Sequence, residues 1–358
     1  MTHPVHVFHP ESGSRYVLFA EGEFGPTTSK TANMLLRYVQ DQVACVVDSR
    51  YAGKMASVIL PFVELQIPIV GSVAGAMEQQ PTHLVIGVAP TGGQLPEGWR
   101  DAINEAIEAG LHIVSGLHTF LADDEEFAER ARRNEVSLID LRKPPETKEI
   151  ARGLWRERTI PTVLTIGPDS AVGKLTTAWE FKQRLEHQGY RVGFVATGQT
   201  GILLHGQGIV VDAVRGDFMS AAVESLIQAE AETDPDVILV EGQGSIYHEG
   251  YSGVTLAILH GTMPDALLFS HRPSKRANMY GFAFPPYRQM INDYEHLIEW
   301  YKPTHSLGIQ IDTSEYEEHI ARALCNEIQD ISGLPTCDFI RFPRSDAIDT
   351  MIRKLHLS

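Results

Sequence analysis

The chain has 358 residues, of which 43% are hydrophobic and 21% charged, so it is long enough for two domains that each bury a core. Its formal net charge of −16 argues against nucleic acid as the main ligand and against a membrane with an anionic surface as a partner. An anionic small ligand would have to be held by local positive groups.

The cysteines and the apolar segments indicate a cytoplasmic protein. Three cysteines lie far apart and without metal-ligand spacing, which suits a reducing compartment (Cys45, Cys325 and Cys337). The chain does not open with a basic segment followed by an apolar one, and no apolar run approaches transmembrane length. The histidines lack a paired metal spacing, so we expect no metal site.

Short apolar stretches alternate with amphipathic ones through the first half of the chain. The predicted strands are 16–20, 43–47, 67–73, 84–89, 112–115 and 136–141, and the predicted helices are 28–38, 99–109 and 124–133. This alternation, with almost continuously apolar strands, predicts an α/β fold whose parallel sheet is covered on both faces, as in Rossmann-like domains.

Polar loops that contain glycine follow four of these strands, at residues 22–30, 48–54, 90–94 and 115–118. Ligands of parallel sheets gather beyond the carboxyl ends of the strands, so these loops either form one wall of a site or are ordinary turns. Residues 142–149 contain two consecutive prolines and mixed charges, which is typical of a linker. We therefore predict domains at 1–145 and 146–358.

The second half begins with a stretch typical of a phosphate-binding loop. An apolar, β-branched strand over 162–166 ends at Gly167, Gly173-Lys174 follows after five residues, and a helical periodicity begins behind them. Free N–H groups at a helix start attract phosphate oxygens, and Lys174 adds a positive charge. The predicted phosphate-binding residues are Gly167, Asp169, Ser170, Ala171, Val172, Gly173, Lys174, Thr176 and Thr177.

The loop departs from the pattern of nucleotide-hydrolysing enzymes at Leu175. Such enzymes place at this position the Ser or Thr whose hydroxyl binds Mg²⁺. Thr176 and Thr177 are close by, but each residue of a helix is rotated by about 100° from the one before. The sequence therefore favours phosphate binding over hydrolysis of Mg·ATP.

Further strands end in polar residues beside this loop. A strand over 191–196 leads into a glycine-rich connection, and a helix over 216–232 precedes the apolar strand 236–240, which ends in Glu241. An acidic residue at that place resembles a Walker B carboxylate, although it can also be a solvated strand end. After a strand over 266–270, residues 271–276 form a basic cluster, either an anion clamp or a solvated turn. A strand over 306–312 and helices over 315–331 and 347–355 complete the domain.

Seven motifs, in this order, resemble those of the DgcN-like family of D-glutamate N-acetyltransferases. They are AEGEFGPTTSKTAN (20–33), DSRYAGK (48–54), VAPTGG (88–93), GPDSAVGKLTT (167–177), ATGQTGI (196–202), VEGQGS (240–245) and YSGVTL (251–256). The resemblance implies an N-terminal Rossmann-like domain and a C-terminal P-loop domain related to dethiobiotin synthetase. It also implies acetyl-CoA as donor and a D-amino acid amine as acceptor. The loop reads Gly-Pro-Asp-Ser where the family suggests Gly-Thr-Asp-Cys.

The resemblance and the loop together give a hypothesis for each role. Coenzyme A carries phosphates that the loop can hold without a hydrolytic Mg²⁺, and amine acetylation needs a proton acceptor and donors to an oxyanion. Glu241 is the first candidate for the base, followed by Asp169 and His248, and the backbone of 242–245 is the candidate for the oxyanion donors. The candidate substrate-binding residues are Lys30, Asp48, Lys54, Thr200, Ser245, Arg272 and Lys275.

Two other classes of function remain open from the sequence. One is an ATP- and Mg-dependent kinase or ligase that acts on a small carboxylate, and the other is a sensor that binds a phosphate ligand without turnover. Metal dependence would separate the first from an acetyltransferase. Homo-oligomeric assembly is expected because enzymes of this size are often symmetric oligomers.

Overall fold

The computed structural model describes residues 6–8, 13–90, 93, 95–145 and 149–357. The chain divides into two compact units, which are described separately: an N-terminal unit of His6–Pro144 and Ile202–Val210, and a C-terminal unit of Pro145–Gly201 and Val211–Ser358. The short segment Ile202–Val210 thus belongs to the N-terminal unit, which the sequence did not indicate. Residues Thr91, Gly92 and Gln94 of a predicted site loop and 146–148 of the predicted linker lie outside the described residues.

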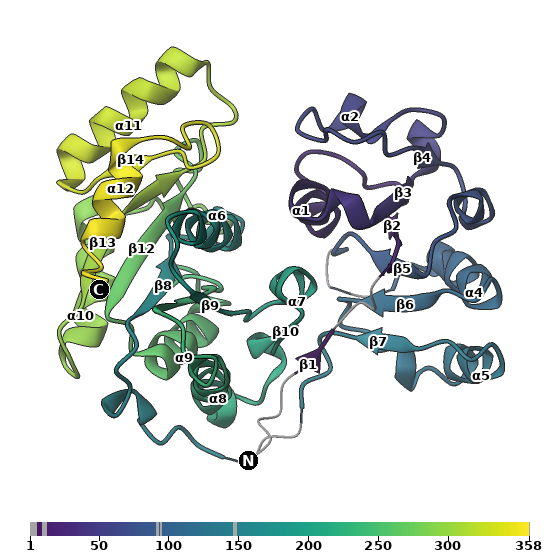
Figure 1. Cartoon of the computed structure of the whole chain (residues 1–358), viewed down its shortest axis with the longest axis horizontal. Helices are drawn as coiled ribbons and strands as arrows, with labels where there is room; N and C mark the ends of the chain where they lie inside the picture. The colour runs from purple at the N-terminus through teal and green to yellow at the C-terminus, as the bar shows by residue number, and fades with distance from the viewer. Residues whose placement is uncertain (1–5, 9–12, 91–92, 94, 146–148, 358) are drawn as a thin grey trace. The chain divides into compact units, whose positions relative to one another are not determined.

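The N-terminal unit is built on six parallel strands in the order β4-β3-β2-β5-β6-β7. Helix α1 covers one face and helices α4 and α5 cover the other (Figure 1). The strands are β2 (Tyr16–Phe19), β3 (Val43–Val47), β4 (Ile69–Val70), β5 (His83–Ile86), β6 (His112–Ser115) and β7 (Leu138–Asp140), and the helices are α1 (Lys30–Tyr38), α2 (Ala56–Ile59), α3 (Val73–Ala76), α4 (Arg100–Glu108) and α5 (Glu125–Arg133). A two-residue strand β1 (His6–Val7) pairs antiparallel with β10 (Gln207–Gly208).

Burial explains why these segments form strands. Every residue of β2, β3 and β5 is buried, so the strands are apolar throughout and do not alternate. The order of the strands reverses between β2 and β5, which puts the loops after both strands at the point where open α/β sheets bind ligands.

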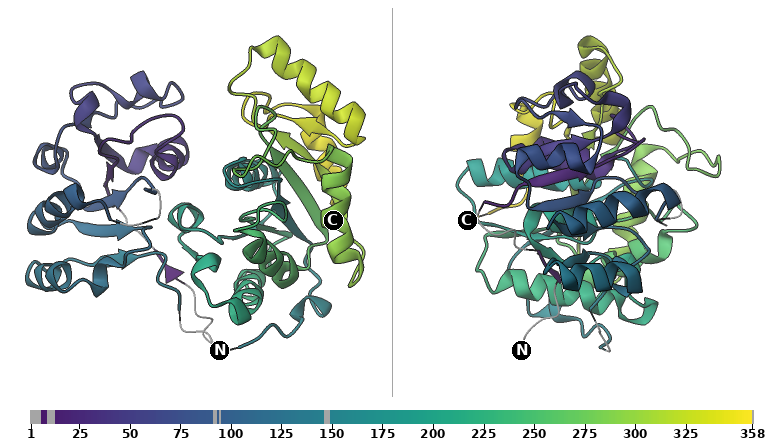
Figure 2. Two further views of the ribbon diagram at one scale, coloured as in Figure 1. Left: turned by 180° about the vertical axis from the view of Figure 1, so that it is seen from behind. Right: turned by 90° about the vertical axis from the view of Figure 1, so that its right-hand side faces the viewer.

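The C-terminal unit has a second six-stranded parallel sheet, in the order β14-β13-β12-β8-β11-β9. Figure 2 shows helix α6 on one face of it and α10 and α11 on the other. The strands are β8 (Thr162–Ile166), β9 (Val192–Val195), β11 (Val237–Val240), β12 (Ala266–His271), β13 (His305–Ile311) and β14 (Thr336–Cys337), and the helices are α6 (Lys174–His187), α8 (Met219–Ala231), α9 (Ser252–Thr262), α10 (Tyr287–Glu299), α11 (Glu318–Ser332) and α12 (Asp346–Arg353). Helix α7 (Gln199–His205) begins in this unit and ends in the segment Ile202–Val210 of the N-terminal unit.

Strand β8 has β12 on one side and β11 on the other, so the sheet reverses its order there. The loop after β8 therefore lies at the switch point of the sheet, where a ligand is expected. One prediction about a loop was wrong: Thr200, in the predicted glycine-rich connection, lies in helix α7.

The fold class predicted from the sequence is confirmed: both sheets are parallel, and the chain is α/β throughout its two units. Among the described residues, every helix is too short or too polar to cross a bilayer.

A buried histidine in the N-terminal unit predicts a loss of stability in acid. His83 is 8% exposed, and burial, together with the charge of His112, lowers its pKa to about 4. The unfolded chain takes up this proton near its ordinary pKa of about 6.5, before the folded protein does. The contribution of His83 to the free energy of unfolding should therefore be constant above pH 6.5. It should fall by about 3 kcal/mol as the pH drops from 6.5 to 4.

Urea unfolding between pH 7.5 and 4 measures this effect. Carboxylates also titrate in this range, so the informative quantity is the difference between the wild type and His83→Asn, whose curve should be flatter. His296→Asn is the matched control, because the His296 side chain is 80% exposed. Parallel curves for the wild type and His83→Asn would contradict the prediction.

Candidate phosphate-binding site

The phosphate loop connects the buried strand β8 to helix α6 over residues 167–173. Its backbone takes unusual conformations at Ala171, with φ of 55°, and at Gly173, with φ of 97°. A Cβ on Gly167 would lie 2.5 Å from the Ser270 carbonyl oxygen and 2.9 Å from Val172 Cγ2, so a larger residue does not fit there. The loop is therefore closely packed on the end of β12.

Lys174 holds its ammonium group inside the loop. The residue is 7% exposed, and Nζ donates a hydrogen bond of 2.7 Å to the Asp169 carbonyl oxygen. This charge lies beside the N–H groups that begin α6, where the positive end of the helix dipole adds to it. The arrangement fits a phosphate ligand.

The side chains of Leu175 and Thr177, which follow Lys174, are buried in the protein. Leu175 is buried at 5% exposure, and Thr177 is completely buried. The Thr177 hydroxyl lies 2.9 Å from the Gly173 carbonyl oxygen and within hydrogen-bonding distance of Ser270 on β12 and Gln310 on β13. Thr177, predicted to bind the ligand, thus lies beneath the loop and supports it from below.

Glu241, the first candidate for the base, is held by protein groups. It follows β11, is 3% exposed, and accepts hydrogen bonds from the backbone N–H groups of Thr197 at 3.1 Å and Gly198 at 3.2 Å. The amide of Gln243 donates a third at 2.9 Å. These three donors occupy the carboxylate oxygens, so Glu241 fastens the turn after β9 to the end of β11.

A second group of side chains surrounds the carboxylate of Asp169 in the loop. We call it the His248 cluster, and it consists of Asp169, His248 and Lys275. Asp169 is 1% exposed, and its Oδ2 lies 2.8 Å from Lys275 Nζ. Its Oδ1 lies 4.0 Å from His248 Nε2. The His248 ring stacks on Tyr251 with 4.3 Å between centroids. The cluster thus combines an imidazole, a carboxylate and an ammonium group next to the loop.

His248 is the unusual member of this cluster. It is 1% exposed, and neither of its ring nitrogens has a hydrogen-bond partner among the described residues. Buried polar atoms are nearly always paired, so such an atom calls for an explanation. A ligand group that bonds to the imidazole would supply the missing partner.

The turn at 242–245 contributes less to an oxyanion site than expected. The Gly242 N–H donates to Thr165 Oγ1 at 2.9 Å and is therefore already used. Ser245 is completely buried, and its Oγ accepts a hydrogen bond from the Tyr247 N–H at 3.1 Å. Tyr294, which sequence reasoning did not identify, donates to the Gly167 carbonyl oxygen at 2.8 Å and ties the start of the loop to α10.

Arg272 joins two strand ends. Its Nη2 lies 2.6 Å from Asp312 Oδ2, and Glu315 is 3.6 Å away. Burial acts to raise the pKa of Asp312, but hydrogen bonds from Ser314 and the charge of Arg272 outweigh it and keep that pKa below its usual value. Arg272 is therefore engaged by carboxylates of the protein, and Thr200 is 7% exposed within α7.

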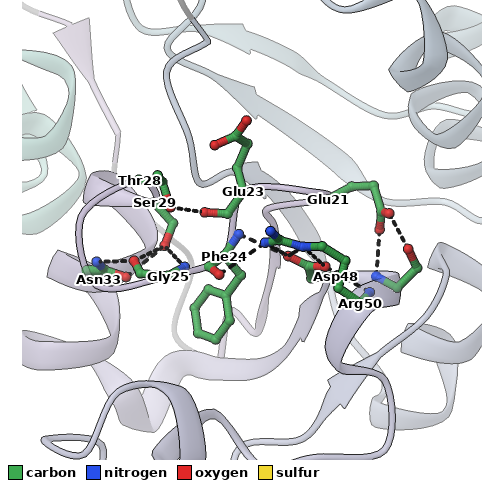
Figure 3. A network of polar contacts seen from close by, with 10 residues as sticks. Glu21, Glu23, Phe24, Gly25, Thr28, Ser29, Asn33, Asp48 and Arg50 are labelled. Carbon is green, nitrogen blue, oxygen red and sulfur yellow. Dashed lines mark hydrogen bonds and ion pairs between the residues drawn. The ribbon is translucent and has the colours of Figure 1, made fainter.

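The remaining predicted substrate residues belong to the N-terminal unit. Lys30 and Lys54 are exposed, whereas Asp48 is completely buried. Figure 3 shows the Asp48 carboxylate between the backbone N–H of Phe24, at 2.9 Å, and the guanidinium of Arg50, at 2.6 Å. Burial acts to raise the pKa of Asp48, but these hydrogen bonds lower it on balance. Asp48 thus fixes the loops after β2 and β3, and Arg50, which sequence reasoning missed, is its partner.

The structure therefore brings together Asp169, Lys174, His248 and Lys275 of the predicted set, around the phosphate loop. Sequence reasoning also missed Ser270 and Gln310, which lie under the loop. Gln310 left a signal, because it is a polar residue between the apolar Ile309 and Ile311 of strand β13. Among the described residues, no three His, Cys, Asp or Glu side chains group together as metal ligands would.

Comparisons with known proteins match both units. A model of the P-loop domain of DUF1611, a domain of unknown function, matches residues 149–348, and a model of its Rossmann-like domain matches 49–144. The crystal structure of a DUF1611 family protein from Anabaena variabilis is similar over 95% of this chain and 99% of that chain, with 33% identity and a TM-score of 0.89.

Two curated relatives have a name that states an activity. A protein from a Pseudoalteromonas species, named D-glutamate N-acetyltransferase, is 35% identical over 76% of this chain and 80% of its own length. A protein of the same name from Tritonibacter scottomollicae is 36% identical over 75% of this chain and 80% of its own length.

Proposed function

Because the chain belongs to the DUF1611 family, we propose that it is an N-acetyltransferase, which moves an acetyl group from acetyl-CoA to the amine of a D-amino acid. The names of the two relatives support this class of reaction and D-glutamate as the first acceptor to test. The observation that carries the proposal on this chain is the phosphate loop, where a buried lysine is followed by a buried leucine.

The loop suits the phosphates of coenzyme A. Lys174 and the N–H groups of residues 173 and 174 would hold them, and half-buried Thr176 lies at the same helix start. Leu175 occupies the place of the hydroxyl that binds Mg²⁺ in hydrolytic loops, and the Thr177 hydroxyl is engaged with Ser270 and Gln310. These features favour a phosphate ligand that is held and not hydrolysed.

His248 is the best-placed base for acetyl transfer. The amine nitrogen forms a bond to the acetyl carbon, the carbon–sulfur bond breaks, the base takes the proton that the nitrogen loses, and the thiolate leaves. The ring nitrogens of His248 have no hydrogen-bond partner among the described residues, and Asp169 at 4.0 Å would stabilise the positive charge that the ring gains with the proton. The pantetheine arm of coenzyme A separates its phosphates from the thioester, so phosphates held at the loop would leave the thioester beyond it.

Lys275 is the candidate for an acceptor carboxylate, because its ammonium group has three N–H donors and Asp169 and the Ser170 carbonyl oxygen take two of them. Its side chain is 32% exposed, and its ion pair with the buried Asp169 holds it beside His248. An acceptor that places a carboxylate on Lys275 would bring its amine toward the imidazole. This arrangement supports an acidic amino acid over an apolar one.

The purified protein should acetylate D-glutamate when acetyl-CoA is supplied. Release of free thiol and the mass of the product would be followed with D-glutamate, L-glutamate, D-aspartate and D-alanine as acceptors. We expect D-glutamate to react fastest, and D-alanine, which lacks the second carboxylate, to react at least about tenfold more slowly. Thiol release equal in all reactions, including one without an amine, would contradict amine acetylation.

A further inference from the structure

Three buried polar side chains from three separate elements meet beneath the phosphate loop. Thr177 comes from α6, Ser270 from β12 and Gln310 from β13, and none is more than 2% exposed. Ser270 and Gln310 are direct partners in the register of the two strands. The Gln310 amide atom that faces them, placed as Oε1, lies 2.7 Å from Thr177 Oγ1 and 3.2 Å from Ser270 Oγ, and the two hydroxyl oxygens are 3.0 Å apart.

The two hydroxyls are also the partners of the loop backbone. Ser270 Oγ lies 2.8 Å from the Val172 carbonyl oxygen. Thr177 Oγ1 lies 2.9 Å from the Gly173 carbonyl oxygen, which also accepts the Thr177 backbone N–H at 2.8 Å. Carbonyl oxygens only accept, so each of these contacts takes the proton of its hydroxyl. The Ser270 and Thr177 oxygens are then left as acceptors toward the amide.

The count of protons decides which end of the Gln310 amide faces the hydroxyls. With the oxygen there, the three side chains supply two protons for five close contacts. With the NH₂ group there, they supply four protons, and both hydroxyls and both carbonyl oxygens are satisfied. We therefore assign the NH₂ group of Gln310 to the side that faces Thr177 and Ser270.

This assignment gives Gln310 an effect on the loop that it does not touch. In a trans peptide the carbonyl and the next N–H point in opposite directions. Holding the carbonyl oxygens of Val172 and Gly173 down toward β12 and α6 aims the N–H groups of Gly173 and Lys174 the other way, out of the core. Those N–H groups are the ones that a phosphate at the helix start would meet.

We propose that Gln310 is a positioning residue of the phosphate loop, which sets the direction of the Gly173 and Lys174 N–H groups through Ser270 and Thr177. The proposal rests on the proposed function only in that a phosphate binds there. The pre-set direction lowers the cost of ordering the loop when the ligand arrives. The loop would bind the donor phosphates with the same strength in the ground state and in the transition state. Loss of the N–H direction set by Gln310 should therefore raise the KM for the donor and leave kcat nearly unchanged.

Gln310→Met tests the proposal, because methionine keeps the volume and removes both donors. We expect the Kd for acetyl-CoA, and for inorganic pyrophosphate as a simpler probe, to rise about fivefold to tenfold. The KM for acetyl-CoA should rise equally, while kcat stays within about twofold. An unchanged Kd in a folded Gln310→Met protein would overturn the proposal.

Ser270→Ala is the second variant, and it tests the same network if Gln310→Met does not fold. It should weaken binding by about fivefold alone, and adding it to Gln310→Met should weaken binding little further, because both act through one network. Ser306→Ala is the matched control, since Ser306 is buried on the same strand β13 and its Oγ has no hydrogen-bond partner among the described residues. An effect of Ser306→Ala equal to that of Ser270→Ala would point to general destabilisation and contradict the proposal.

Amide hydrogen exchange of the ligand-free protein separates this proposal from the proposed function. Gln310→Met should speed exchange about tenfold in the peptide that covers 167–177 and leave the other strands of the sheet unchanged. If the wild type binds neither acetyl-CoA nor pyrophosphate, the proposed function fails, and the exchange result still decides the role of Gln310. Equal exchange in the two proteins would overturn that role.

Discussion

Replacing Lys174 by alanine is expected to weaken binding of acetyl-CoA strongly and, with it, to lower turnover at ordinary donor concentrations. The ammonium group lies within the loop, where it hydrogen-bonds to the Asp169 carbonyl oxygen and is 7% exposed. Charge-assisted hydrogen bonds to a phosphate in such a place are worth about 2–3 kcal/mol, so we expect Kd to rise at least about 30-fold.

Calorimetric titration of the variant measures this loss, and a thermal melt checks that the variant is folded. Lys182→Ala is the control, because Lys182 lies on the same helix and pairs with Glu186 at 2.6 Å, away from the loop. The control should bind acetyl-CoA like the wild type. A folded Lys174→Ala protein with wild-type affinity would show that the donor is held elsewhere.

His248→Gln should lower kcat by about 10²- to 10⁴-fold and leave the Kd for acetyl-CoA within about twofold. The reason is that the ring nitrogens of His248 have no hydrogen-bond partner among the described residues, whereas the proposed site for the donor is the loop itself. Single-turnover measurement of acetyl transfer, beside the calorimetric Kd, separates the two effects. His260→Gln is the control, since His260 lies on the nearby helix α9 and packs against Tyr301.

Glu241→Gln is the comparison that tells the two candidate bases apart. An amide can still accept hydrogen bonds from Thr197 and Gly198, so we expect kcat to fall less than tenfold. If Glu241→Gln removes turnover and His248→Gln does not, the base is Glu241 and the role of His248 given above is wrong.

The sequence was sufficient for the fold class, the phosphate loop and the family. The family is confirmed by the models that match both units and by the curated relatives. These features were predictable because each depends on residues that are close together in the chain. Buried strands are apolar throughout, and the loop is a strand, a glycine-bounded turn and a helix in immediate succession.

The sequence did not show which polar side chains pair with other groups of the protein, because these pairs form only in the folded structure. Arg272 looked available for an anion, but Asp312 pairs with it across neighbouring strands. Asp48 looked like a substrate residue, but it binds Phe24 and Arg50 within its own unit. A charged side chain shows in a sequence, whereas the group that neutralises it depends on tertiary packing.

Helix α9 is an element whose secondary structure also depends on tertiary packing and could not be predicted from its own residues. It contains Gly253, Gly261 and the β-branched Val254 and Thr255, which are weak helix formers. Packing requires glycine at position 261, because a Cβ on Gly261 would lie 2.5 Å from the Ser220 carbonyl oxygen in α8. The close contact between the two helices therefore overrides the local preference, and no pattern within residues 252–262 shows it.

The measurement that tests the account most directly is calorimetric titration of the wild-type protein with acetyl-CoA and, in parallel, with ATP and Mg²⁺. The account predicts binding of acetyl-CoA that does not depend on metal, and weaker or no binding of Mg·ATP, because Leu175 replaces the Mg²⁺-binding hydroxyl. Tight binding of Mg·ATP with no signal from acetyl-CoA would contradict the acetyltransferase and would favour a kinase or ligase.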